Sequence, residues 1–133
     1  MIHGMSSVLA RVALVGCGGF LGAVLRYALS GFVHRQLAFT TFPVGTLAVN
    51  LAGCLAIGVL AGLADARQLL GPELRAFAMI GLLGGFTTFS SFGFETFALL
   101  RDGEHARAAL NVVLQVLLGL AGVWLGYALV ASR

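Results

Sequence analysis

Two pairs of polar side chains stand inside otherwise apolar stretches of this sequence and could do chemistry there. Asn50 follows Thr46 by four residues, and Gln115 follows Asn111 by four. In a helix the members of each pair would share a face. A carboxamide offers two N–H donors and one oxygen acceptor. Such groups can replace the water around an ion, or they can bond one membrane helix to another. The sequence leaves both roles open for Asn50.

The segment from Gly81 to Phe92 concentrates three glycines, two threonines and two serines in a stretch that carries no charge. Gly costs about 1 kcal/mol relative to Ala in a helix, and Ser and Thr hydroxyls compete for helical backbone bonds. The pattern predicts that a helix unwinds near Gly84–Thr88. Broken helices at membrane depth offer carbonyls to cations and N–H groups to anions. The alternative is a kinked helix that packs closely against its neighbours.

Two aromatic residues and one acid follow that segment at helical spacing. Phe89 and Phe92 are three residues apart and Glu95 comes three later, so we expect all three on one face. Aromatic pairs in apolar helices are usually packing residues. The electropositive edge of an aromatic ring can, however, face a small anion.

A single basic residue lies deep in the first apolar stretch. Arg26 stands between Arg11 and Arg35 as the only charge. An Arg at the centre of a membrane costs about 2.5–3.5 kcal/mol on insertion scales. It can lower that cost by reaching the membrane surface with its long side chain, or it can attract an anion. The sequence is compatible with both of these roles for Arg26.

Composition places these groups in a membrane. The 133 residues are 59% hydrophobic and 10% charged, with a mean hydropathy of +1.01. Soluble domains carry about 25% charged residues. The net charge of +3 comes with scattered Arg residues and no basic run, which argues against a nucleic-acid partner.

The apolar stretches predict an all-α membrane protein. A bilayer about 30 Å thick requires about 20 helical residues, and we expect one domain (1–133) of four spans, near 8–33, 43–64, 74–100 and 106–130. The third span is the one expected to break at mid-membrane. Four spans place both termini on one side.

Glycines and arginines indicate how these spans assemble. Each span carries glycines four residues apart, a spacing that lets helices pack closely in lipid: Gly18/Gly22, Gly58/Gly62, Gly81/Gly85 and Gly122/Gly126. The arginines near span ends are almost evenly divided between the two sides, with Arg11, Arg67, Arg75 and Arg133 on one and Arg35, Arg101 and Arg107 on the other. This near balance allows both orientations in the membrane.

Three blocks of sequence carry a resemblance to a known family. They are GGFLGAVLRY at Gly18–Tyr27, FPVGTLAVNLAG at Phe42–Gly53 and GLLGGFTTFSSFGFE at Gly81–Glu95. In this order and spacing the chain resembles the Fluc (also called CrcB) fluoride channels of prokaryotes. The resemblance implies a passive fluoride-selective channel in the cytoplasmic (inner) membrane, built as an antiparallel dual-topology homodimer with two pores.

The resemblance also implies roles for individual residues. It implies a structural Na⁺ at the dimer centre, held by the backbone carbonyls of Gly84 and Thr87. The other residues that we assign to the fluoride path are Asn50 as a donor, Phe89 and Phe92, Arg26, Glu95, Thr46, Ser91, Asn111 and Gln115. The chain departs from the family pattern at Ser91, where Thr is usual, and at Asn111 and Gln115, where an aromatic residue and Ser are expected.

Other function classes fit the residues less well. No catalytic constellation or phosphate-binding loop is present, so we expect no enzyme. The runner-up is a small multidrug-type exporter, which also has four spans and dual-topology dimers. A proton-coupled cation pump of that kind needs a buried carboxylate in its first span, where this chain has Arg26.

Overall fold

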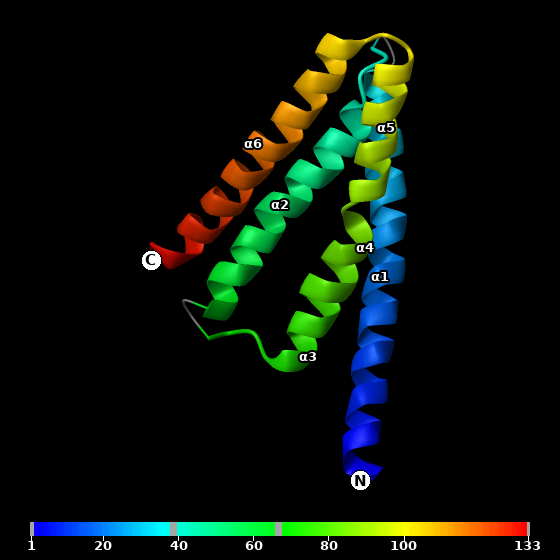
Figure 1. Ribbon diagram of the computed structural model, residues 1–133. Helices are drawn as coiled ribbons and strands as arrows, with labels where there is room; N and C mark the ends of the chain where they lie inside the picture. Colours follow the sequence, from blue (N-terminus) through cyan, green and yellow to red (C-terminus); the bar gives the residue numbers. More distant parts are fainter. Residues whose placement is uncertain (1, 38–39, 66–67, 133) are drawn as a thin grey trace.

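The computed structural model describes residues 2–37, 40–65 and 68–132, with side chains described from Ser7 onward. Arg67 and Arg133, two of the arginines used in the charge count, lie outside the described residues. Figure 1 shows the helical elements in chain order: α1 (Ile2–Gln36), α2 (Val44–Asp65), α3 (Pro72–Arg75), the π-helix η1 (Ala76–Leu83), α4 (Gly84–Phe86), α5 (Phe89–Arg101) and α6 (His105–Ala131).

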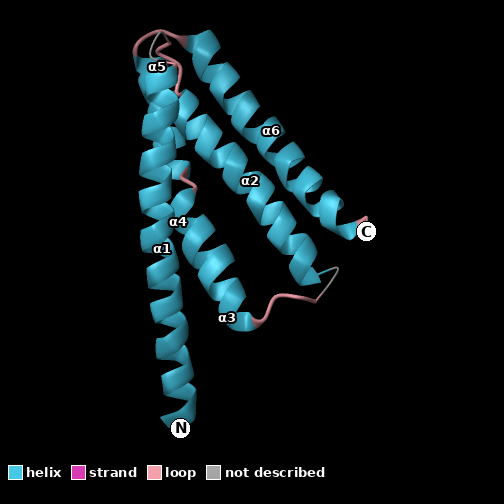
Figure 2. Cartoon of the chain, turned by 180° about the vertical axis from the view of Figure 1, so that it is seen from behind, coloured by secondary structure: helices cyan, strands magenta, loops and turns pink. Residues whose placement is uncertain are grey.

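Four helical stretches are long and apolar enough to cross a membrane, as the sequence predicted. They run over Ser7–Gln36, Val44–Asp65, Pro72–Arg101 and His105–Ala131. The third is a composite of α3, η1, α4 and α5, and Figure 2 shows the short loop that separates α4 from α5. The predicted fold class, four helices with the third one broken, is therefore confirmed, and the described residues contain no strand.

Glycines bring α1 against the first half of the third span. A Cβ added at Gly22 would collide with the Leu82 carbonyl and lie 2.7 Å from the Phe86 nitrogen. A Cβ on Gly81 would lie 2.7 Å from the Val15 carbonyl oxygen. Two backbones can come this close only where no side chain stands between them. The predicted Gly18/Gly22 and Gly81/Gly85 spacings therefore face each other.

A second glycine contact joins α2 to α6. A Cβ on Gly58 would collide with the Val123 carbonyl, and one on Gly126 would collide with the Leu55 carbonyl. A Cβ added on Gly62 would lie 3.0 Å from the Val130 Cβ. The structure thus contains two close helix pairs, α1 with η1–α4 and α2 with α6. The helix α5 continues the third span, meets α6 near the loop that joins them and diverges from it farther along (Figure 1).

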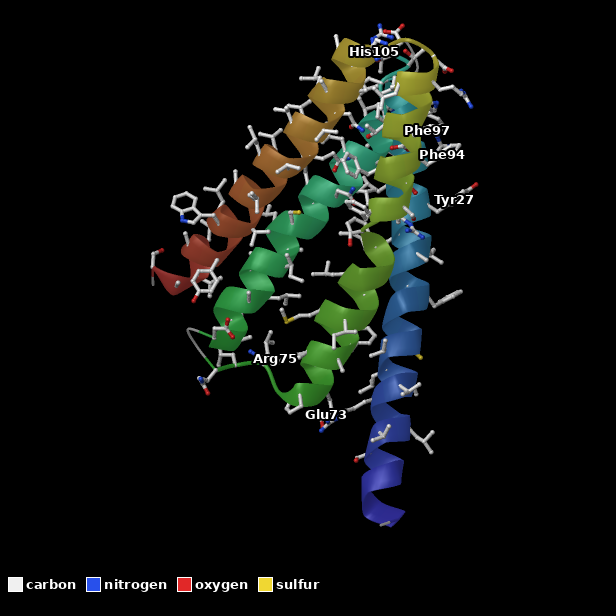
Figure 3. The ribbon with its side chains drawn as sticks, in the orientation of Figure 1. Tyr27, Glu73, Arg75, Phe94, Phe97 and His105 are labelled. Carbon is white, nitrogen blue, oxygen red and sulfur yellow. The ribbon has the colours of Figure 1, made fainter. Side chains whose placement is uncertain are left out.

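Charged residues gather at the two ends of the bundle. At one end Arg75 bonds to Asp65 at 2.9 Å, and at the other Arg107 donates to Thr41 Oγ1 at 2.8 Å. Figure 3 shows Glu73 and Arg75 at one end and His105 at the other. Between the ends the outer surface is apolar, and Tyr27 projects outward from α1 with 85% of its surface exposed. An apolar belt between charged ends is what a bilayer requires.

The α1 contact can be tested with two glycines of the same helix. Gly22→Ala should destabilise the protein by about 1–3 kcal/mol, because the new methyl overpacks the contact with Leu82 and Phe86. Gly16→Ala is the matched control, since a Cβ there meets nothing within 4 Å. Thermal unfolding in detergent, followed by fluorescence-detected size exclusion, measures both. Equal midpoints for the two variants would contradict this helix contact.

Candidate functional site: a clamped break between two cavities

The third span is interrupted over only two residues. Thr87 (φ −80°, ψ 159°) and Thr88 (φ −150°, ψ 111°) are extended, whereas Gly84 is helical (φ −63°, ψ −37°). The break is therefore narrower than the predicted Gly84–Thr88. The π-helix that precedes it, Ala76–Leu83, was not predicted. Irregular backbone at membrane depth needs hydrogen-bond partners from within the protein, since lipid provides none.

Asn50 of α2 supplies those partners. Its Nδ2 donates to the Thr88 carbonyl at 3.2 Å, and its Oδ1 accepts from the Thr88 N–H at 2.9 Å. Both polar groups of one backbone residue are thus satisfied by one side chain, an arrangement that we call the Asn50 clamp. Thr46, one turn earlier, donates to Glu95 Oε1 at 2.6 Å. The prediction that Thr46 and Asn50 share a face is confirmed, and that face packs on the third span.

Hydroxyl groups complete the two sides of the break. Thr88 Oγ1 caps α5 by accepting from the Ser91 N–H at 3.2 Å. Thr87 donates to the Leu83 carbonyl with its N–H at 3.0 Å and with its hydroxyl at 2.9 Å. The Thr87 methyl occupies the space where a Cβ on Gly53 would stand. Gly53 therefore lets α2 approach the break closely enough for Asn50 to reach it.

The clamp and the cap divert two N–H groups away from backbone carbonyls. In an unbroken helix Thr88 N–H would bond to the Gly84 carbonyl, and Ser91 N–H would bond to the Thr87 carbonyl. Here these two donors go to Asn50 and to Thr88 Oγ1. The carbonyls of Gly84 and Thr87, the two residues assigned to Na⁺ by resemblance, are therefore among those that lose their helical donors at the break.

Gln115 of α6 joins the clamp. Its Oε1 accepts from Asn50 Nδ2 at 3.1 Å. Its Nε2 is buried and has no hydrogen-bond partner within the described part of the chain. Both N–H groups of Asn50 are consequently engaged, one by Thr88 and one by Gln115, whereas the N–H groups of Gln115 are not.

A cavity of about 380 Å³ lies on one side of the break. We call it the phenylalanine cavity, because Phe89 and Phe92 line it with ring centroids 5.4 Å apart and ring planes at 63°. Phe89 is 82% exposed. The lining is Asn50, Gly53, Cys54, Ile57, Met79, Leu83, Gly84, Thr87, Thr88, Phe89, Phe92, Gln115 and Val116.

A second cavity, of about 460 Å³, lies on the other side of the break. We call it the arginine cavity. It is lined by Ala23, Arg26, Tyr27, Ser30, Gly31, His34, Thr46, Val49, Thr88, Ser91 and Glu95. Among the described residues the Arg26 guanidinium makes no ion pair, and Glu95 Oε2 is buried without a partner. Thr88 lines both cavities, so the break stands between them.

Most of the residues that the sequence singled out line one of the two cavities. Glu95 and Asn111, however, lie apart from the residues that we expected beside them. Glu95 lines the arginine cavity, whereas Phe89 and Phe92 line the other. Asn111 is fully buried between α5 and α6, where its Nδ2 donates to Thr96 Oγ1 at 2.9 Å. It is not among the residues that line either cavity.

Sequence reasoning missed two threonines that organise the site. Thr88 is clamped by Asn50, and Thr96 links Asn111 to the Phe92 carbonyl, to which it donates at 2.8 Å. The signal for Thr88 was present, because Thr directly before a helical stretch is a typical N-cap. No sequence pattern singles out Thr96.

Comparison with known proteins places the chain in a family. The profile of the family described as "CrcB-like protein, Camphor Resistance (CrcB)" matches residues 13–127. A relative from Methylobacillus flagellatus, named fluoride-specific ion channel FluC, is 47% identical over 90% of this chain and 94% of its own length. One from Opitutus terrae with the same name is 50% identical over 85% and 86%. A third, from Methanosarcina acetivorans, named fluoride-specific ion channel FluC 1, is 44% identical over 86% of each.

These matches, together with the broken third span, define a four-span membrane protein of prokaryotic type. The chain belongs to the CrcB-like family, as its sequence blocks predicted.

The clamp predicts an order of stabilities for two variants. Asn50→Leu strands the N–H and the carbonyl of Thr88 inside the membrane and should cost about 2–6 kcal/mol, at about 1–3 kcal/mol for each lost partner. Thr88→Val keeps the clamp and removes the cap of α5 together with the hydroxyl contacts to Ser90 and Ser91, which should cost about 1–2 kcal/mol in all. Thermal unfolding in lipid nanodiscs measures both variants. If Thr88→Val were the more damaging of the two, the clamp would not be what holds the break.

Proposed function

We propose that this protein is a fluoride-selective channel through which F⁻ crosses the membrane passively and leaves the cell. The observation that carries the proposal is identity of 47% over 90% of the chain with a relative named as a fluoride-specific ion channel. The site agrees with that role, because it places hydrogen-bond donors and aromatic ring edges at membrane depth. A channel needs no catalytic residues; that the chain is not an enzyme stays a prediction.

The proposed path runs from the arginine cavity past the break into the phenylalanine cavity. Arg26 attracts anions into the first cavity, which Thr46, Ser91 and Glu95 also line. Beyond the break no acidic residue lines the phenylalanine cavity. An ion that enters it exchanges water for N–H donors and for the edges of Phe89 and Phe92. Passage requires no proton or second ion.

We further propose that the functional unit is an antiparallel homodimer in the cytoplasmic membrane. Gly84 has open space around it, since a Cβ there would meet nothing within 4 Å, and Phe89 is 82% exposed. The broken span therefore presents an uncovered face. A two-fold axis in the membrane plane would bring this face against its own copy, because an isologous contact pairs the same patch on both subunits.

A structural Na⁺ fits that proposed contact. The described residues include no group of three or more His, Cys, Asp or Glu that could hold a metal ion. Backbone oxygens are therefore the available ligands, and a hard cation accepts them readily. The Gly84 and Thr87 carbonyls have lost their helical donors. When bound, Na⁺ would supply positive charge between two carbonyl-rich breaks.

The exporter alternative finds no support in the site. A proton-coupled cation pump needs a carboxylate in its first span, and α1 contributes Arg26 to the arginine cavity instead. A positive charge at that place repels a cationic substrate.

The channel function can be tested directly. Purified protein in liposomes loaded with fluoride or with chloride should release F⁻ rapidly and hold Cl⁻, with no dependence on a pH gradient. Ion-selective electrodes for the two anions provide the readout, and liposomes loaded in the same way but without protein are the control. Equal release of both anions, or no fluoride release, would reject the proposal.

The dimer can be tested through its charge balance. Two or three Lys residues added to the loop at 102–104 should lock the chain in one orientation, and the same number added near residue 70 should lock the other. Each locked variant should be inactive alone in fluoride efflux, and mixing the two should restore it. Full activity of either variant by itself would show that opposite orientations are not required.

A further inference from the structure

The direction in which the rings of Phe89 and Phe92 point depends on how α5 is turned about its own axis. Both residues lie in the first turn of this helix and line the phenylalanine cavity. Successive helical residues are about 100° apart around the axis, so a rotation of α5 moves both ring edges relative to the cavity. A binding group must be held within about 10–20° of its productive orientation. The contacts that fix the rotation of α5 therefore aim the rings.

Apolar packing within the chain fixes that rotation only weakly. Of the 13 residues of α5, all of which the structure describes, only Leu99 is buried. Phe94 and Phe97 of the same helix, labelled in Figure 3, are exposed. Hydrophobic stabilisation is roughly proportional to the apolar area removed from water, so a helix that buries one residue gains little of it from its own chain. Polar side chains of α5 therefore carry a larger share of its attachment.

Two adjacent residues of α5 make hydrogen bonds to two different helices. Glu95 accepts from Thr46 of α2 at 2.6 Å, and Thr96 Oγ1 accepts from Asn111 Nδ2 of α6 at 2.9 Å. One such bond would let α5 turn about it, whereas two bonds that leave the helix about 100° apart fix its rotation. The Thr96 hydroxyl also donates to the Phe92 carbonyl at 2.8 Å. Thr96 thus ties the turn that carries Phe92 to α6.

The bond between Thr96 and Asn111 adds little to stability. Thr96 gives its only hydroxyl hydrogen to the Phe92 carbonyl, so it can only accept from Asn111, and this fixes the amide with Nδ2 toward Thr96. Asn111 Oδ1 is then buried without a partner within the described chain. An unsatisfied buried acceptor costs at least as much as one hydrogen bond contributes. Buried polar residues of this kind can specify one arrangement of helices at a cost in stability.

We propose that Thr96 and Asn111 are positioning residues that hold the rings of Phe89 and Phe92 toward the phenylalanine cavity. We call the pair the Thr96–Asn111 lock. The inference rests on the proposed function, in which fluoride passes the ring edges, and it moves Asn111 from the fluoride path to the support of that path. Neither Thr96 nor Asn111 lines the cavity, so both act through the helix that carries the rings.

Three variants separate positioning from stability. Thr96→Val removes the hydroxyl at nearly constant shape, and Thr96→Ser, the matched control, keeps it. The double variant, Thr96→Val with Asn111→Leu, removes both partners and should keep or raise the wild-type thermal unfolding midpoint, because it leaves neither side chain with an unpaired polar group. Fluoride efflux from liposomes should fall at least about tenfold in Thr96→Val and in the double variant, because the rings are no longer held in place. Thr96→Ser should conduct like the wild type.

A spectroscopic measurement reports the orientation of the ring directly. Phe92 is replaced with 4-fluorophenylalanine, and its ¹⁹F signal is recorded in lipid nanodiscs. The lock predicts one narrow signal in otherwise wild-type protein and in Thr96→Ser, and a shifted or split signal in Thr96→Val. The same label at Phe77 of η1, which lies before the break, is the control and should give the same signal in all variants.

Three results would overturn the proposal. They are normal efflux by the double variant, a Phe92 signal that Thr96→Val leaves unchanged, and a thermal midpoint of the double variant that falls in parallel with its efflux, which would make the pair a structural contact. In each case the wild-type protein still conducts fluoride and the proposed function stands. If the wild-type protein conducts no fluoride, the proposed function fails, and the ¹⁹F measurement still decides whether the lock aims the ring.

Discussion

Backbone groups in a lipid bilayer have no water to bond with, and the rest of this structure follows from how that constraint is met at Thr88. A helix satisfies its own backbone, but two extended residues do not. The amide of Asn50 takes both polar groups of Thr88, so the break persists without unpaired backbone at that residue. The carbonyls of Gly84 and Thr87 become available through the same diversion of donors. A membrane helix can therefore be opened at one place by a side chain from its neighbour.

The clamp depends on close helix packing elsewhere. Asn50 reaches the break because Gly53, on the same helix, leaves room for the Thr87 methyl. Farther along, Gly58 and Gly126 allow the backbones of α2 and α6 to come into contact. This contact sets the position of Gln115 along α6 relative to Asn50 on α2. Glycines contribute little attraction of their own, and their role is to let other groups come within bonding distance.

Periodicity and composition predict the parts of this structure that depend on local sequence, and they miss those that depend on a distant partner. The four spans, the paired glycines and the shared face of Thr46 and Asn50 all followed from spacing. The break is narrower than its glycine content suggested, because the length of the unwound segment is set by what Asn50 can satisfy. The burial of Asn111 against Thr96 also depends on how two helices meet, which no single helix encodes. The roles assigned by resemblance to Na⁺ and to the dimer stay predictions.

Amide hydrogen exchange at Thr88 tests the central claim, that this backbone residue is clamped although it lies outside any helix. The measurement is made by NMR on wild-type protein in lipid nanodiscs, with α2 amides as the internal reference. The Asn50 bond predicts that Thr88 N–H exchanges as slowly as the amides of α2 do, because breaking that bond requires α2 to separate from the third span. Exchange at the rate of an unbonded, water-exposed loop amide would contradict the account.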